Sequence, residues 1–440
     1  MKKILLASTA LVAASMMYAG AAEAAEKIKL NIGGYSKWWV VGVWQSDAFQ
    51  RTSANGPGGS GNTVNNTTNG SGQRVNADVK GDNEIWFSGS TALDNGLKVG
   101  VFVSMEAGGH SDLQTDVIDA SYAWIEGGFG KVLAGALVNG TVMTHVQAPD
   151  AANGNIGGSM LGLNFAVAKP SSVLTMNNIV GYSQSTNTTA IGIDDKAEKI
   201  TYVAPSFYGL TLGASYIPNA MRSDSRVTPL GRASAYGATA LYTNTFGPVG
   251  VKASTGYVYT DLSALGNFGV LDYQALSFGT QLSYAGFTLG GSAQKSVQNN
   301  DRVGQSNLTN TLLGATFTAG TSANGLAGIG TNKGSAPLDF GGVAYDVSLM
   351  YASGPYAVSF GYYHSEVNGI MTPTAAQSGK KDTVEFYQAS GKYNLGPGVD
   401  ALATIGYADY KDQRKGTMGI SDAAYENSGW AAMTGLSLTF

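Results

Sequence analysis

Few residues in this sequence could carry catalysis or hold a metal ion. The 440 residues include no cysteine and three histidines, His110, His145 and His364, which are far apart in the chain. Without cysteine, disulfides, thiolate zinc sites and cysteine nucleophiles are excluded. The Gly-x-Ser-x-Gly elbow that presents a nucleophilic serine is also absent, although a serine and a histidine joined only by the fold would leave no such motif. We therefore expect no enzyme, no cofactor and no metal site.

Charged residues are sparse and nearly balanced. They form 13% of the chain, which is about half the usual share. The 26 lysines and arginines against 30 aspartates and glutamates give a net charge of −4. A nucleic-acid partner would require a basic patch, so we expect none. The 61 glycines, the 23 tyrosines and a mean hydropathy of −0.02 fit neither a disordered chain nor a helical membrane protein.

The N-terminus has the pattern of a secretory signal peptide. Lys2 and Lys3 precede an apolar stretch over residues 4–19, and Ala22-Glu23-Ala24 supplies small residues for cleavage. We therefore assign residues 1–24 to the signal peptide and residues 25–440 to the mature domain, with an uncleaved N-terminal anchor as the alternative. No later window holds 18 apolar residues. An exported chain of this kind could cross a membrane only with strands.

Alternation of apolar and polar residues runs through the mature chain. In residues 97–107, Leu97, Val99, Val101 and Val103 share one face, while Lys98, Gly100, Ser104 and Glu106 share the other. Residues 274–284 repeat the pattern. This period of two predicts strands. In a soluble sandwich the apolar face would point to a core, and in a membrane barrel it would point to lipid.

The lengths of the connections favour the barrel. Short turns and long polar segments alternate along the chain, as in outer-membrane barrels with short periplasmic turns and long external loops. The turns are Asp94-Asn95-Gly96, Gly127-Gly128-Phe129-Gly130, Phe207-Tyr208-Gly209, Phe246-Gly247-Pro248, Ala285-Gly286, Ser353-Gly354-Pro355 and Gly396-Pro397-Gly398. The long segments include 46–82, 139–197, 218–233, 260–272, 296–339 and 367–381.

These patterns predict an all-β fold, a transmembrane antiparallel β-barrel of sixteen strands. The expected strands are 27–45, 83–92, 97–107, 116–126, 131–138, 198–206, 210–217, 234–245, 249–259, 273–284, 287–295, 340–352, 356–366, 382–394, 399–411 and 427–440. We interpret 308–318 as part of a long loop, with eighteen strands as the alternative. Because both terminal segments are apolar on one face, the last strand is expected to pair with the first and remove both sheet edges.

The chain resembles the Gram-negative general-diffusion porins, of the kind common in alphaproteobacteria. The motifs are Gly34-Tyr35-Ser36-Lys37-Trp38-Trp39 in the opening strand, residues 127–135 at the fourth turn, residues 199–210 after the third external loop, and the terminal Phe440. The resemblance implies a trimer, a third external loop (139–197) folded into the lumen, and recognition of Phe440 by the barrel-assembly machinery.

The resemblance also implies a pore constriction, where acids on the third loop face basic residues on the wall. The candidate residues are Lys37, Glu84, Asp119, Asp150, Asp194, Asp195 and Lys199. Glu84 and Asp119 stand where many relatives carry arginine, and a register with Ile85 and Tyr122 on the lipid side turns both acids to the lumen. The basic half of the constriction is thus depleted, which favours cations. Calcium binding by Asp150, Asp194 and Asp195 is the alternative for the loop acids.

Six tryptophans are expected in an aromatic girdle at the membrane interfaces or in the trimer contact: Trp38, Trp39, Trp44, Trp86, Trp124 and Trp430.

The function expected from these features is passive diffusion of ions and small hydrophilic solutes through a water-filled channel in the outer membrane, with a mild preference for cations. The partners expected are outer-membrane lipid and lipopolysaccharide. A channel selective for sugars or for one cation is an alternative, and aromatic tracks that face the lumen would favour sugars. A non-conducting structural or adhesive barrel is a further alternative.

Overall fold

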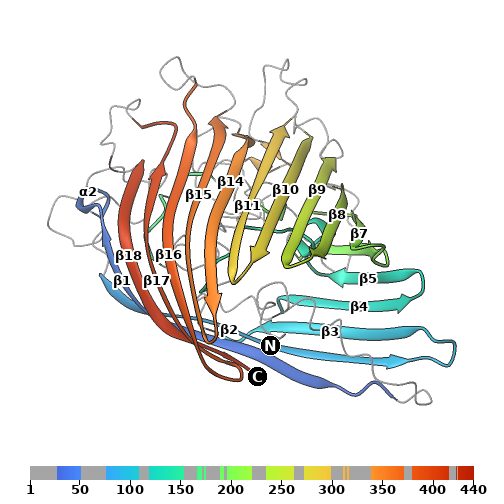
Figure 1. The fold of residues 1–440 in the computed structure, drawn as a ribbon. Coiled ribbons are helices and arrows are strands. Elements are labelled where there is room, and N and C mark those ends of the chain that lie inside the picture. Colours follow the sequence, from blue (N-terminus) through green and yellow to red (C-terminus); the bar gives the residue numbers. More distant parts are fainter. Residues whose placement is uncertain are drawn as a thin grey trace.

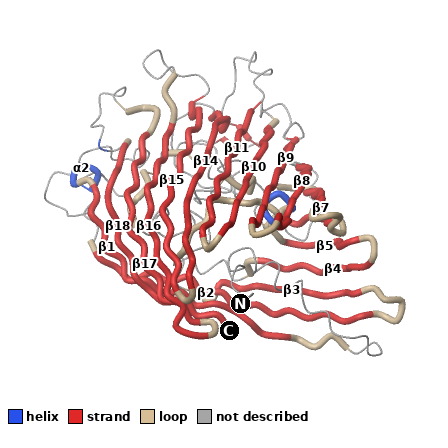
Figure 2. The backbone as a smooth tube through the Cα atoms, viewed as in Figure 1, coloured by secondary structure: helices blue, strands red, loops and turns tan. Residues whose placement is uncertain are grey.

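Sixteen antiparallel strands close into one barrel (Figures 1 and 2). The computed structural model describes residues 27–50, 76–108, 118–152, 166–170, 173–174, 189–192, 196–220, 234–261, 272–298, 311–312, 315–316, 338–370, 379–415, 423 and 425–440. The barrel strands are β1 (Asn31–Gln45), β2 (Ala77–Ala92), β3 (Lys98–Glu106), β4 (Ala120–Gly127), β5 (Gly130–Ala136), β6 (Glu198–Val203), β7 (Leu210–Ile217), β8 (Ser234–Phe246), β9 (Val249–Asp261), β10 (Tyr273–Tyr284), β11 (Phe287–Gln298), β14 (Leu338–Ser353), β15 (Tyr356–Ile370), β16 (Asp382–Gly396), β17 (Val399–Lys411) and β18 (Glu426–Thr439). The expected sixteen-stranded barrel is confirmed.

Closure joins the two ends of the chain. β1 pairs with β18. The amide of Gly34 donates to the carbonyl of Phe440 at 3.0 Å, and the amide of Phe440 donates back to Gly34 at 3.1 Å. The pairing satisfies backbone amide and carbonyl groups that β1 and β18 would otherwise leave without partners, so neither strand is an open edge of the sheet. The chain end lies beside the turn between β16 and β17, where Thr439 donates to the carbonyl of Gly398 (Figure 1).

The eighteen-strand alternative is wrong. Within 308–318, β12 (Thr311–Leu312) and β13 (Ala315–Thr316) pair only with each other, in a two-stranded sheet separate from the barrel. The segment therefore belongs to the long connection between β11 and β14, as predicted.

Two strand boundaries differ from the expectation and affect the site. β2 begins at Ala77 rather than at residue 83, because β1 continues upward and its backbone groups need partners as far as the Gly42–Ala77 pair. β4 begins at Ala120 rather than at residue 116. Residues expected in an external loop, Asp82 among them, thus belong to the barrel wall.

The register assigns each side chain to the lumen or to the outer face. On β1, Trp38 and Val40 are exposed on the outer face (48% and 59%), whereas Trp39 and Val41 are fully buried on the inner face. Partners directly opposite each other in an antiparallel pair share a face, so the assignment carries from strand to strand around the barrel. The outer face is largely apolar, as expected of a surface against lipid.

The tryptophans divide between the two faces. Trp38, Trp44 and Trp430 face outward and fit the expected girdle or subunit contact. Trp39, Trp86 and Trp124 face inward, which corrects the expectation for these three. Neighbours such as Trp38 and Trp39 must point to opposite faces of a strand, so the six could not all lie in one girdle.

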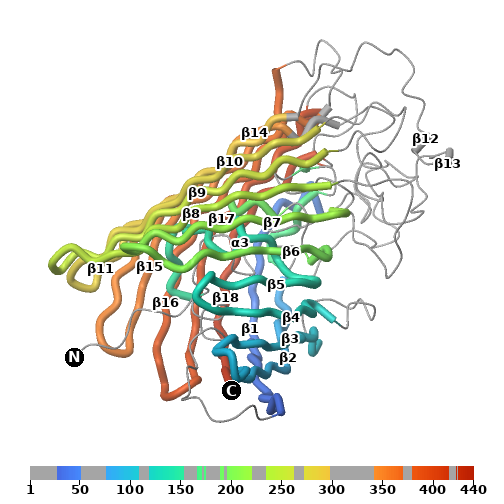
Figure 3. Tube along the Cα trace, turned by 90° about the vertical axis from the view of Figure 1, so that its right-hand side faces the viewer, coloured from blue at the N-terminus to red at the C-terminus, as the bar shows by residue number. Residues whose placement is uncertain are grey.

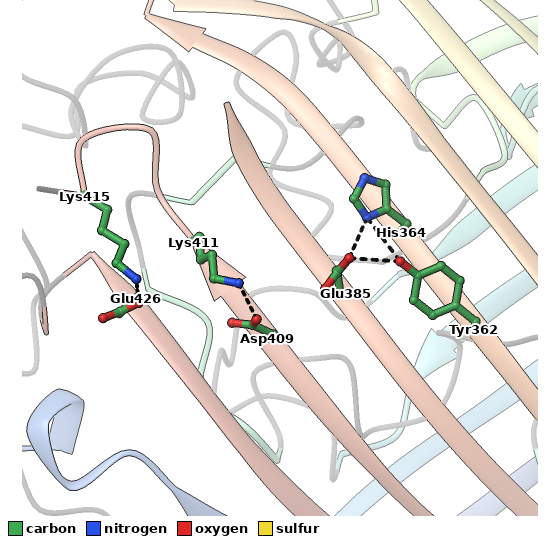
Figure 4. Close-up of polar contacts among 7 residues, drawn as sticks. All are labelled: Tyr362, His364, Glu385, Asp409, Lys411, Lys415 and Glu426. Atoms are coloured by element: carbon green, nitrogen blue, oxygen red, sulfur yellow. Dashed lines mark hydrogen bonds and ion pairs between the residues drawn. The ribbon is translucent and has the colours of Figure 1, made fainter. Parts of the chain in front are cut away.

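A charged row marks the upper limit of the apolar outer face. Tyr387, Tyr407 and Trp430 lie in one row across β16 to β18. Directly above them, Glu385 accepts from Tyr362 at 2.9 Å and contacts His364 at 3.2 Å, and Figure 4 shows the neighbouring ion pairs Lys411–Asp409 and Lys415–Glu426. Aromatic residues favour the interface between hydrocarbon and headgroups. We therefore expect the charged row at the level of lipid headgroups.

The loop between β5 and β6 lies inside the barrel. It begins with α3 (Gly140–Met143), which contacts the inner faces of β6 to β9 (Figure 3). A further four-residue helix, α2 (Asp47–Gln50), follows β1. A Cβ atom on Gly279 of β10 would lie 1.7 Å from the carbonyl oxygen of Val146, so glycine is required where the loop crosses this strand. Further on, Val167 and Leu174 join the buried apolar cluster that includes Trp39 and Tyr410. The predicted inward course is confirmed for the described parts of the loop.

Wall side chains satisfy the buried backbone of this loop. Six loop amides donate to side-chain oxygens of the barrel: Gly140 to Ser215 (2.9 Å), Val146 to Ser254 (2.8 Å), Ala148 to Asp346 (3.2 Å), Ala151 to Ser359 (2.9 Å), Ala168 to Gln45 (3.1 Å) and Leu174 to Asp382 (2.9 Å). In return, Gln281 and Asn427 donate to loop carbonyls at 2.7 Å each. These acceptors come from β1, β7, β9, β14, β15 and β16, so the loop is fixed around most of the circumference.

In the part of the chain that the structure describes, no helix is long and apolar enough to cross a membrane.

The first prediction concerns Asp346, which accepts from Ala148 and, at 2.7 Å, from the Ser292 hydroxyl. Asp346→Leu leaves both donors without an acceptor and should destabilise the docked loop by about 1–3 kcal/mol. Asp346→Asn keeps one acceptor oxygen and should lose less. The thermal transition in detergent and the noise of the single-channel current measure the effect. An unchanged transition and a quiet current in Asp346→Leu would contradict the proposed anchoring.

The second prediction concerns pH. His145 is buried in the loop, bonded to Thr189 at 2.9 Å, and burial lowers the pKa of its ring to about 4. An unfolded histidine titrates near 6.5, so docked His145 binds fewer protons than the unfolded residue between these values. The contribution of His145 to the stability of the docked loop should therefore fall by roughly 1.4 kcal/mol per pH unit below about 6.5, until the pKa of the docked ring is reached. His145→Gln cannot be protonated, so its thermal transition should depend less on pH over this range; equal pH dependence in both proteins would refute the effect.

Candidate functional site

The lumenal wall formed by β1 to β4 carries a cluster of charged side chains. Lys37 lies opposite Asp82, and its ammonium is 3.5 Å from Asp82 Oδ2. The Tyr35 hydroxyl donates to Asp82 Oδ1 at 3.0 Å. Since Lys37 faces inward beside Trp39, Asp82 does so as well. Both charges are half-buried and remain accessible to the lumen.

Two carboxylates face each other in the same cluster. Glu84 lies opposite Tyr35 on one side and opposite Glu106 on the other, so both acids point to the lumen. Like charges directly opposite each other destabilise a sheet. Among the described residues, neither acid has an ion pair, and Glu106 Oε2 is buried without a hydrogen-bond partner. Two lumenal carboxylates without an ion-pair partner among the described residues create a negative potential that attracts cations.

Asp119 closes the cluster at the start of β4. It accepts from the Ser104 hydroxyl at 3.2 Å and forms an ion pair with Lys196, which lies at the exit of the inward loop. The register predicted for this strand is wrong by one residue: Ala120 and Tyr122 lie opposite Ser104 and Phe102 on the lumenal face. Asp119 reaches the lumen because it precedes the strand, where alternation no longer decides its direction.

The cluster is acidic overall. Its four acids, Asp82, Glu84, Glu106 and Asp119, face two lysines, Lys37 and Lys196, and each lysine is paired with one acid. Lys80 on the same wall is paired with Asp78 at 2.6 Å. Nearer the turns, Lys131 is paired with Glu126 at 3.5 Å and Lys392 with Asp400 at 3.9 Å. Lys98, opposite Glu126, and Lys252 on β9, opposite Gln281, also face the lumen.

Two of the predicted site residues anchor the loop. Asp150 is buried, accepts from the Gln388 amide at 2.7 Å and from Ser359 at 3.4 Å, and burial raises the pKa of its carboxyl. Lys199 is buried and donates to the backbone carbonyls of Leu137 and Ala197. Both side chains therefore hold loop backbone and wall together. Asp194 and Asp195 lie outside the described residues.

The structure thus brings together Lys37, Glu84 and Asp119 and adds Asp82, Glu106 and Lys196. Glu106 shares the polar face of residues 97–107 with Ser104, so alternation alone could have indicated it. Asp82 was assigned to a loop because β2 was expected to start later. Lys196 is the loop residue that pairs with Asp119 across 77 positions, and no local pattern signals such a contact.

The two described histidines lie on opposite sides of the wall. His145 is buried in the inward loop, and His364 faces outward on β15; His110 lies outside the described residues. Among the described residues, no group of three or more histidine, cysteine, aspartate or glutamate side chains could hold a metal ion.

Comparisons with known structures place this fold among porins. An anion-selective porin from Comamonas acidovorans superimposes with a TM-score of 0.55 at 14% identity, covering 94% of this chain and all of its own. The outer-membrane channel DcaP of Acinetobacter baumannii gives 0.53 at 12% identity, covering 95% and 100%. A loop-deletion mutant of OmpT, an outer membrane protein of Vibrio cholerae, gives 0.51 at 10% identity, covering 93% and 99%. At such identities the likeness shows the fold alone.

No curated protein matches the sequence. The family model for Gram-negative porins matches residues 7–413, which is most of the chain. With the closed sixteen-stranded barrel and its inward third loop, this match establishes that the chain belongs to the Gram-negative porins.

Proposed function

We propose that this porin is a passive channel for ions and small hydrophilic solutes that prefers cations. The excess of acids over lysines on the lumenal wall of β1 to β4 carries the proposal. Fixed charges beside a low-dielectric wall attract counter-ions, and salt screens them over about 8–10 Å. The preference should therefore be strongest at low salt. The likeness to an anion-selective porin does not oppose it, because a shared fold does not determine the charges in the lumen.

The described residues also fit a channel that catalyses no reaction. Its described histidines are separated by the barrel wall, and its lumenal acids belong to a wall that remains accessible to solutes. The signal peptide at residues 1–24 and recognition of Phe440 by the assembly machinery remain part of the proposal, and both would deliver the chain to the outer membrane.

Under a salt gradient, we expect the zero-current potential to have the sign of a cation-selective channel. Removing charge with Glu84→Gln and Glu106→Gln together should lower the cation-to-anion permeability ratio by roughly two- to fivefold. Asp119→Asn should act in the same direction, although it also frees Lys196.

Glu385→Gln is the matched control, because this acid faces outward and should leave the ratio unchanged. Anion preference in the unmodified channel, or equal effects of the Glu84 and Glu385 substitutions, would refute the acidic wall as the source of selectivity.

We further propose a homotrimer. Trp38 and Trp44 are exposed on the outer face of β1, and Trp44 lies directly opposite Trp430 of β18. Large apolar and aromatic patches on an outer surface favour contact between subunits.

An unheated detergent gel should show a band near three times the mass of the chain that collapses on boiling. Trp44→Ala with Trp430→Ala should lower the temperature of that collapse, whereas the outward-facing Phe278→Ala on β10 should not. A monomer by light scattering in mild detergent would contradict the assembly.

Lipopolysaccharide is the lipid partner that we propose for the charged row above the girdle (Figure 4). Lys411 and Lys415 present ammonium groups to the phosphates of such headgroups, and the neighbouring Asp409 and Glu426 suit cations that bridge them.

A further inference from the structure

The lumenal wall of β1 to β4 also carries aromatic side chains in consecutive rows. The row nearest the periplasmic turns has Trp124 opposite Gly100, and the next has Phe102 opposite Tyr122. The third has Trp86 opposite Gly33, and the fourth has Tyr35 opposite Glu84. Rows on one face are about 7 Å apart along a strand. The rings therefore extend for about 20 Å and end at the acidic cluster.

Glycines make room for two of these rings. A Cβ atom on Gly33 would lie 2.3 Å from Trp86 Nε1, and one on Gly100 would lie 2.4 Å from the Trp124 ring. Each indole thus lies over a glycine of the neighbouring strand instead of extending across the lumen. Phe102 and Tyr122 stack with their centroids 5.2 Å apart, and Tyr35 and Trp86 are 6.1 Å apart.

The five side chains remain half-buried. Aromatic groups that served only as core would be covered, as Trp39 is. Here part of each ring is in contact with the lumen, where apolar surface is unfavourable unless a solute covers it.

The charges beside the rings indicate which solute fits. The ammonium of Lys37 already lies 4.3 Å from the centre of the Tyr35 ring, and that of Lys131 lies 3.9 Å from the Trp124 ring. A second cation stacked on either ring would be repelled. Neutral rings meet no such obstacle, and the carboxylates of Asp82, Glu84 and Glu106 at the end of the track can accept hydrogen bonds from hydroxyl groups.

We propose that this wall, the aromatic track of Tyr35, Trp86, Phe102, Tyr122 and Trp124, binds neutral polyhydroxylated ring solutes, hexoses and short oligosaccharides, as they pass through the lumen. The apolar faces of the sugar rings stack on the aromatic rings, and their hydroxyls bond to the acids above. The proposal rests on the channel function proposed above and names a class of solute for it.

Block of the ion current by maltotriose tests the track in planar bilayers. The current should fall saturably with maltotriose and should not fall with sorbitol, which has hydroxyls but no ring. Trp86→Ala and Phe102→Ala should each raise the half-blocking concentration about tenfold, the equivalent of 1.4 kcal/mol. Trp86→Phe keeps a ring and should stay within about twofold of the unmodified protein. Phe278→Ala is the matched control for Phe102, because Phe278 faces outward on β10.

Equal block by maltotriose and sorbitol, or unchanged block in the alanine variants, would overturn the track. Binding of maltotriose measured by intrinsic tryptophan fluorescence in detergent needs no current and separates the two proposals. Conductance without saturable binding would refute only the sugar track. Binding without conductance would refute only the channel.

Discussion

The structure depends on one constraint: the backbone of the inward loop must find hydrogen-bond partners inside the barrel. A buried amide without an acceptor costs about 1–3 kcal/mol, and a loop across a lumen has no strand to pair with. Serine, aspartate and glutamine side chains of the wall supply the acceptors, from Ser215 on β7 round to Gln45 on β1. Polar residues on the inner face therefore serve first to hold this loop.

This constraint divides the lumen in two. Where the loop is docked, the wall is covered: Ser277 on β10 and Asp346 on β14 are buried. The inner faces of β2 to β4 retain half-buried aromatic and acidic side chains that contact the lumen. In the channel that we propose, ions and solutes meet Glu84, Glu106 and Phe102 and not the acids that hold the loop. On this proposal, the position of a lumenal charge relative to the loop decides whether it anchors the loop or acts on passing ions.

The sequence predicts the barrel well because its signals are local. Turn residues such as Ser353-Gly354-Pro355 and alternation in the flanking runs fix the strands, and the apolar faces at the two ends predict closure. The site is less predictable. Whether Asp119 faces the lumen depends on where β4 begins: Asp119 lies just before the strand, where alternation does not fix its direction. The predicted faces of Ala120 and Tyr122 are reversed because the register of this strand differs by one residue from the prediction. The burial of Asp150 and Lys199 depends on contacts with residues far away in the chain, such as Gln388, 238 positions from Asp150, which no local pattern encodes.

The division of the lumen can be measured directly, because the chain has no cysteine of its own. Single cysteines at Ser88, on the open wall opposite Phe102, and at Ser277, under the loop, can be treated with a charged methanethiosulfonate reagent during bilayer recording. We expect rapid modification of Ser88→Cys with a change in current, and much slower modification of Ser277→Cys. Equal rates at the two positions, or an unchanged current after modification of Ser88→Cys, would contradict this division.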